Sequence, residues 1–139
     1  MPLTPDSWLA FVVSLPSSSA TARMRIWRAV KALGCAALRD GTYLLPAQAT
    51  QAEQLQTLSD EALQEGGQAW LLQVHAQDMA EQAAFQALFD RAADYARWLE
   101  DVGQTRPLLP TLSSAELQRH QRRLGRAYEA IRKIDFFPG

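Results

Sequence analysis

The sequence predicts an α+β protein, a ferredoxin-like (split βαβ) antiparallel sheet followed by a C-terminal pair of long helices. Three observations predict it: two uncharged strand-like runs at 7–15 and 68–75, a hairpin signal between them, and helical apolar spacing on either side of that hairpin. We place the sheet in residues 1–78. The helical pair occupies 79–139 and either packs on the sheet as one compact domain or mediates dimerisation.

The first strand and helix lie before residue 35. The run SWLAFVVSL is rich in aromatic and β-branched residues without polar alternation, which is typical of a central strand buried on both faces. PSSSAT then supplies turn and capping residues, and a helix follows to Gly34, where a C-terminal glycine is expected.

A hairpin, a second helix and a second strand follow. Asp40 and Gly41 separate two apolar runs and predict a hairpin, with a single strand bent at the glycine as the alternative. Thr50 and Glu53 form a capping-box pattern that opens a helix ended by EGG. QAWLLQVH is then a strand of about the length of the first.

The last third of the chain predicts two helices. Asp78 and Glu81 form a second cap, after which apolar residues at helical spacing as far as Leu99 predict one long third helix. Two prolines within 103–112 break it, and a last helix follows. The last helix begins at the capping pair Ser113 and Glu116, and its apolar stripe recurs every seven residues at Leu117, Leu124 and Ile131.

Charge is segregated along the chain although the formal net charge is only −1. Residues 1–40 carry five basic and two acidic side chains, residues 41–105 carry two and ten, and residues 106–139 carry seven and three. Two basic ends therefore flank an acidic middle, which directs the search for a binding surface to the first and last helices.

The first helix places its cations away from its apolar face, which is centred on Ile26. Cations in the first turns oppose the helix dipole at about 0.3–1 kcal/mol each, and no acidic residue lies on this helix to offset them. A solvated face and an anion-binding face are both open readings. The candidate residues are Arg23, Arg25, Arg28 and Lys31.

The last helix carries a second basic ridge opposite its apolar stripe. A solvated face again explains it without a ligand, but two ridges on a small protein are typical of a nucleic-acid binder. Because aromatic side chains are not obviously interleaved, backbone contact with double-stranded DNA is favoured over single-strand binding. The candidate residues are Arg119, Arg122, Arg126 and Lys133.

Other chemistries have little support in the sequence. No phosphate loop, dinucleotide fingerprint, Ser-His-Asp order or metal-ligand cluster is present, so we expect no enzyme, catalytic residue, cofactor or metal site. One cysteine, Cys35, excludes an internal disulfide, and no run is long enough to span a membrane. A cytoplasmic location is the default expectation.

The first 46 residues resemble the N-terminal domain of the ChrB family, regulators of bacterial chromate-resistance operons. The resemblance rests on Leu15-Pro16, on the R-x-x-x-W-R-x-x-K-x-L-G pattern of residues 23–34, and on DG-x-Y-L-LP at 40–46; the ending AIRKIDFFPG is also similar. The opening is similar as well to the middle domain of PaaX-type repressors and to small CRISPR-associated nucleases. The aspartate with which those nucleases hold a metal at the end of the first strand is absent from VVSLP.

The resemblance implies a transcriptional repressor of chromate-efflux genes that contacts operator DNA and releases it when chromate appears. A homodimer would match a palindromic operator. Two alternatives stay open: an interaction module, in which the last helix and the apolar face of 85–99 pair the chains or dock another domain, and direct binding of the chromate oxyanion at the Arg23 and Arg25 end of the first helix. Family members continue into a C-terminal domain thought to take part in sensing.

Overall fold

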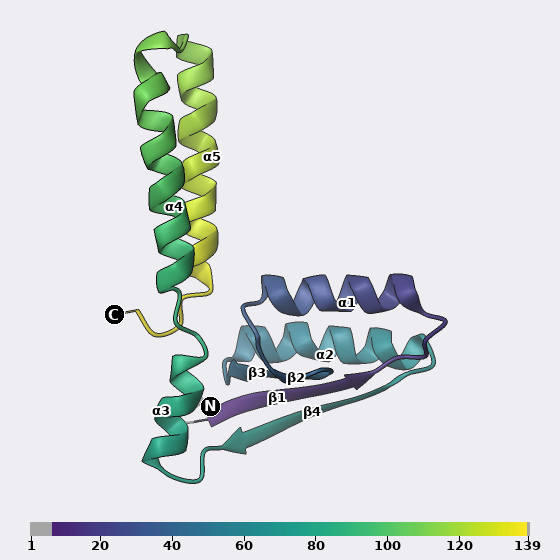
Figure 1. Cartoon of the computed structure of the whole chain (residues 1–139). Coiled ribbons are helices and arrows are strands. Elements are labelled where there is room, and N and C mark those ends of the chain that lie inside the picture. The colour runs from purple at the N-terminus through teal and green to yellow at the C-terminus, as the bar shows by residue number, and fades with distance from the viewer. Residues whose placement is uncertain (1–6, 139) are drawn as a thin grey trace. The chain divides into compact units, whose positions relative to one another are not determined.

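The computed structural model describes residues 7–138 and divides into two compact units, Met1–Phe89 and Asp90–Gly139. The first unit holds the sheet with three helices (Figure 1). Its elements are β1 (Ser7–Ser14), α1 (Ala20–Ala32), β2 (Ala36–Arg39), β3 (Thr42–Pro46), α2 (Ala49–Gln64), β4 (Gln68–His75) and α3 (Met79–Ala87).

The four strands form one sheet in the order β2-β3-β1-β4, and each neighbouring pair is antiparallel. Two β-α-β passages whose strands interleave in this order make the split unit of a ferredoxin-like sheet, which confirms the predicted fold class. β1 is a central strand, as expected from its composition. Trp8 and Phe11, which alternate to opposite faces of the sheet, are both 0% exposed.

One face of the sheet is covered by α1 and α2, and the other is partly open (Figure 1). The register of β1 with β4 pairs Ala10 with Leu72 and Val12 with Trp70, so these four side chains share a face. Trp70 is 59% exposed and Leu72 is 48% exposed although α2 packs on β4. Their face is therefore the one opposite the two helices.

The helix α3 covers one end of this second face by packing against Trp8. The indole Nε1 of Trp8 donates to Oε1 of Gln82 at 2.9 Å, while Phe85 meets the ring edge-on at 5.5 Å and Phe89 stacks on it at 5.6 Å between centroids. These contacts explain why α3 and Phe89 belong to the first unit.

The hairpin signal at Asp40 and Gly41 is confirmed as the turn between β2 and β3. Gly41 has a φ of 77°, and a Cβ at this position would lie 2.6 Å from the carbonyl oxygen of Val13. The backbone N–H of Val13 donates to the Gly41 carbonyl at 2.8 Å. Only glycine allows the turn to approach β1 this closely.

Two local predictions are wrong. The helix α2 begins after Gln48, with no side-chain cap, so Thr50 and Glu53 do not form the expected capping box. The predicted long third helix is divided into α3 and a second helix that begins at Ala92. Phe89 stacks on Trp8 at the break. The carboxylate of Asp90 then accepts from the backbone N–H of Ala92 at 2.9 Å, at the start of the second helix.

The second unit is a pair of helices, α4 (Ala92–Thr105) and α5 (Ser114–Lys133), joined by the 3-10 helix η1 (Arg106–Thr111). Ser113 caps α5 by accepting from the N–H of Glu116 at 3.2 Å, as predicted. Nε1 of Trp98 on α4 donates to the carbonyl of Leu124 on α5 at 2.9 Å, and the ring of Tyr128 lies 5.0 Å from that of Trp98. The apolar stripe of α5 is thus used in packing on α4.

We expect Trp8→Ala to lower the free energy of unfolding of the first unit by about 3–5 kcal/mol, because it leaves a cavity between β1 and α3 and orphans the Gln82 amide. Urea unfolding followed by circular dichroism measures the change. Trp27→Ala is the matched control, because this tryptophan is 45% exposed on α1 and its loss should cost less than about 1 kcal/mol. Equal losses in the two variants would contradict the role given to Trp8.

Candidate nucleic-acid interface

The helix α1 folds onto the sheet through a narrow apolar stripe. Ala22, Ile26 and Val30 are buried, and the charged residues lie on the outer surface, as their spacing predicts. Its N-cap residue, Ser19, makes no side-chain hydrogen bond, and no acidic residue lies in the first turn. The positive end of the helix dipole is therefore not offset from within α1.

The positive charge of Arg25 is offset by two carboxylates. Its guanidinium lies 3.3 Å from a carboxylate oxygen of Glu61 and 3.8 Å from one of Glu65, both on α2. The partners of Arg25 are thus supplied by the neighbouring helix. An anion that binds Arg25 must compete with two carboxylates already in place.

The helix α2 makes the surroundings of α1 acidic. The helix and its C-cap residue together carry four acidic side chains and no basic one, at Glu53, Asp60, Glu61 and the C-cap Glu65. The basic α1 and the acidic α2 lie side by side on one face of the sheet (Figure 1). At distances larger than the separation of the two helices their opposite charges partly cancel, and salt screens the remainder beyond a Debye length of about 8–10 Å. The helix α1 alone is therefore a weak attractor of a polyanion.

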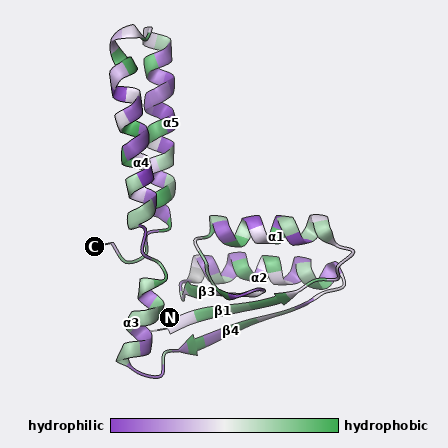
Figure 2. Ribbon diagram, in the orientation of Figure 1, coloured by the Kyte–Doolittle hydropathy of each residue, from purple (hydrophilic) through white to green (hydrophobic). Residues whose placement is uncertain are grey.

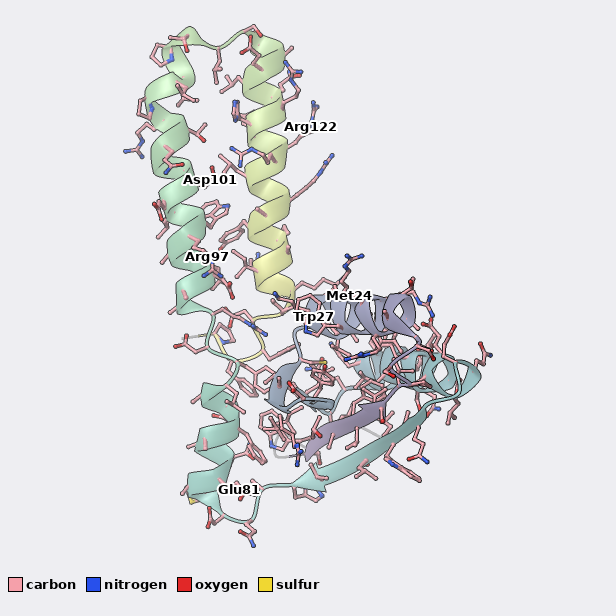
Figure 3. The ribbon with its side chains drawn as sticks, turned by 45° about the vertical axis from the view of Figure 1, so that its right-hand side comes forward. Met24, Trp27, Glu81, Arg97, Asp101 and Arg122 are labelled. Atoms are coloured by element: carbon pink, nitrogen blue, oxygen red, sulfur yellow. The ribbon has the colours of Figure 1, made fainter. Side chains whose placement is uncertain are left out.

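The remaining cations of α1 are exposed. Arg23 and Arg28 make no ion pair with any residue between 7 and 138, and Arg28 lines an open hollow of about 560 Å³ together with Arg25 and Met24. The Nζ of Lys31 lies 4.8 Å from the ring centre of Trp27, which is 45% exposed (Figure 3). One exposed aromatic ring therefore does lie among the cations of α1, where the sequence showed no obvious interleaving of aromatic residues.

The α5 ridge, defined as Arg119, Arg122, Arg126 and Lys133, places four cations on one side of α5, with Glu129 between Arg126 and Lys133. All four side chains are exposed, and none makes an ion pair within the described part of the chain. Figure 3 shows the side chain of Arg122 pointing away from α4, and Figure 2 shows hydrophilic residues along the length of α5. At 1.5 Å per residue, the ridge extends over about 21 Å of helix.

Two further arginines of α5 are paired and lie off the ridge. Arg123 contacts the carboxylate of Asp101 on α4 at 2.5 Å and so joins the two helices, and Arg132 lies 3.7 Å from Glu129 on its own helix. The division of α5 into paired and unpaired arginines leaves its positive charge concentrated on the side opposite α4.

The C-terminal end of α5 is anchored to the start of α4. The hydroxyl of Tyr95 donates to the carboxylate of Asp135 at 2.8 Å, and Nε of Arg91 donates to the carbonyl of Ile134 at 3.1 Å. The hydrogen bond to Asp135, with a smaller contribution from burial, raises the pKa of Tyr95 above its ordinary value of 10.0. The ridge is therefore carried by a helix held to α4 at its C-terminal end and, through Arg123, near its middle.

The candidate residues fall on two separate surfaces, one on each compact unit. The structure brings together Arg25 and Arg28 of α1 around one hollow, and it brings together the four residues of the α5 ridge. Among residues 7–138, no three His, Cys, Asp or Glu side chains are grouped so as to hold a metal ion. No helix in the described part of the chain is both long and apolar enough to cross a membrane.

The fold and surface define an α+β protein with a ferredoxin-like sheet and a separate basic helical pair. Comparison with known sequences then shows its family: the family model described as "Protein ChrB, N-terminal" matches residues 23–137. The chain is also 50% identical over 139 residues to Protein ChrB of Cupriavidus metallidurans, across 99% of this chain. The chain belongs to the ChrB family and corresponds to its N-terminal domain.

The match covers 43% of the length of the Cupriavidus protein, so the chain spans less than half of that relative. No solved structure matches the chain. The family resemblance drawn from the sequence is thereby confirmed, whereas the roles of the individual cations are not addressed by these comparisons.

We expect Asp135→Asn to lower the pKa of Tyr95 toward 10.0, because the phenol loses its charged acceptor. A raised pKa stabilises the folded state below about pH 10, and that contribution is lost as the pH rises through the folded-state value. NMR titration of the tyrosine ring checks the shift. Asp94→Asn is the control, since Asp94 pairs with Arg97 instead; a shift of Tyr95 in the control alone would contradict the assignment.

Proposed function

We propose that this chain is the DNA-contacting domain of a chromate-responsive transcriptional repressor, and that the α5 ridge contacts the phosphates of operator DNA. The observation that carries the proposal is the set of four exposed cations on one side of α5, none of which has an acidic partner among residues 7–138. Membership of the ChrB family supports the regulatory setting. In this proposal the protein acts in the cytoplasm and is not an enzyme.

The α5 ridge is better suited to phosphate than α1 is. Three of its four cations are arginines, whose planar guanidinium matches phosphate oxygens in a bidentate geometry. On α1, by contrast, Arg25 is already paired and the carboxylates of α2 lie alongside. We therefore assign α1 a secondary role, in which Arg23, Arg28 and Lys31 add contacts at the edge of the DNA footprint.

Binding of the chromate oxyanion at the start of α1 is the less favoured candidate. A free oxyanion there would need the guanidinium of Arg25, which Glu61 and Glu65 hold. The family's C-terminal portion, to which the remaining length of the Cupriavidus relative corresponds, is the better place to look for sensing.

We expect Arg122→Ala and Arg126→Ala each to weaken binding to the promoter of the chromate-resistance operon. Binding to DNA of unrelated sequence should weaken by about the same factor, because a phosphate contact does not depend on the base sequence. Each should lower the slope of log affinity against log salt by about 1, because each removes one phosphate contact. Fluorescence anisotropy at several salt concentrations measures the slope. The control is Arg97→Ala, an exposed arginine on α4 that pairs with Asp94 and lies off the ridge. A slope unchanged in both ridge variants would remove the ridge from the DNA interface.

The double variant Glu61→Gln with Glu65→Gln tests the secondary role of α1. Freeing Arg25 and removing two negative charges should raise DNA affinity and increase the salt slope by about 1, while the loss of an exposed ion pair costs about 0.2–1 kcal/mol of stability. The control for the same change of net charge is the double variant Glu53→Gln with Glu100→Gln, since both carboxylates are exposed and form no ion pair in the described part of the chain. If DNA affinity rises equally in both proteins, α1 makes no specific contact.

A further inference from the structure

The two edges of the sheet differ in length, regularity and charge. The edge strand β2 has four residues, a register irregularity between Ala37 and Arg39, and a charged residue at its end, all devices that discourage pairing with another strand. The edge strand β4 has eight residues, QAWLLQVH, with no Asp, Glu, Lys, Arg or Pro and an uninterrupted register with β1. Within residues 7–89, β4 therefore presents a regular edge along which no further strand is paired.

Apolar side chains flank this edge on both faces of the sheet. Trp70 and Leu72 are exposed on the open face. On the helical side, Leu63 of α2 is 54% exposed and lies on the side of that helix opposite Glu61 and Glu65, hence away from α1. Since α2 packs on β4, this side of α2 overhangs the open edge.

We propose that β4 pairs antiparallel with β4 of a second copy of this chain, so that two four-stranded sheets join into one. An antiparallel pair of identical strands is self-complementary about a two-fold axis. A two-fold axis at Leu71 or at Leu72 keeps Trp70 and Leu72 of both copies on the same face of the joined sheet. With the axis at Leu71, Trp70 lies opposite Leu72 of the second copy. With the axis at Leu72, Trp70 lies opposite Val74 of the second copy. The exposed apolar residues of the open face then form one continuous surface across the axis.

Charge favours a second copy over a charged peptide at this edge. β4 carries no charged side chain that could pair with those of a peptide, and for the same reason two copies of β4 meet without like-charge repulsion. The carboxylates of Glu61 and Glu65 lie on the far side of α2 and are held by Arg25. The acidic residue nearest to the side of Leu63 is Asp60, whose carboxylate accepts from Nε2 of Gln56 at 3.1 Å.

The helical pair is a weaker candidate for joining two copies than the sequence led us to expect. The side of α5 that carries the apolar stripe already packs on α4, where the rings of Trp98 and Tyr128 are in contact. Arg123 of α5 also pairs with Asp101 of α4. The large apolar side chains that remain exposed on this unit are Leu99 of α4, at 61%, and Leu108 and Leu109 of η1, at 48% and 42%. They lie on two different helical elements, which offer no strand edge for backbone pairing, whereas β4 adds such an edge to its apolar side chains.

The experiment is sedimentation of this 139-residue chain from low micromolar to near-millimolar concentration, for the wild type and the single variants Trp70→Lys and Leu72→Lys. The wild type should dimerise, and each variant should raise the dimer Kd by at least about tenfold, because a lysine is then dehydrated or repelled at the interface. Both positions are exposed, so folding should be retained, and circular dichroism checks it.

The control variants are Leu38→Lys, which places the same charge beside the opposite edge, and Leu99→Lys on α4. Both should dimerise like the wild type. A wild type that stays monomeric at every concentration overturns the proposal, and so does loss of the dimer in Leu99→Lys with retention in Trp70→Lys and Leu72→Lys, which would assign dimerisation to the helical pair.

Cross-linking keeps the proposal testable if a lysine variant fails to fold. In a Cys35→Ala background, Leu72→Cys should form a disulfide-linked dimer by itself if the axis lies at Leu72. It should do so only when mixed with Trp70→Cys if the axis lies at Leu71. Leu38→Cys is the control and should remain monomeric, and cross-linking of Leu38→Cys alone would also overturn the proposal.

Discussion

The first unit depends on the burial of β1 on both faces of the sheet. The central strand β1 buries Phe11 on one face of the sheet and Trp8 on the other, so helices must pack on both faces. The two faces are covered to different extents. The helices α1 and α2 span the face of Phe11, while α3 reaches only the Trp8 end of the other face. The incomplete second layer explains at once why α3 belongs to the first unit and why Trp70 and Leu72 remain exposed.

A similar division governs the charges. Two arginines form ion pairs between helices: Arg25 joins α1 to α2, and Arg123 joins α5 to α4. Exposed pairs of this kind contribute only about 0–1 kcal/mol each, so they matter less for stability than for removing those arginines from the list of available ligands. What is left unpaired on α5 is a one-sided ridge, and a one-sided distribution of charge is what long-range attraction of a polyanion requires.

Much of the fold could be predicted from the sequence because local patterns determine it. The apolar composition of β1, the glycine turn at Gly41 and the caps at Asp78 and Ser113 are confirmed. The break after α3 could not be predicted, because the apolar periodicity continues through it and the cause is a distant contact with Trp8. The eight candidate cations were predicted to be surface residues, but only the structure shows that Arg25 is paired, since its partners lie 36 and 40 residues away in sequence.

The two proposals rest on different surfaces and fail independently. Phosphate contact is a property of α5 in the second unit, whereas pairing of β4 is a property of the first. If both hold, each dimer carries two copies of the α5 ridge, so dimeric protein should show about twice the salt slope of a monomeric Trp70→Lys variant while the contribution of each arginine is unchanged. A variant that stays monomeric yet retains the full wild-type slope would separate DNA binding from dimerisation, because every phosphate contact would then come from one chain.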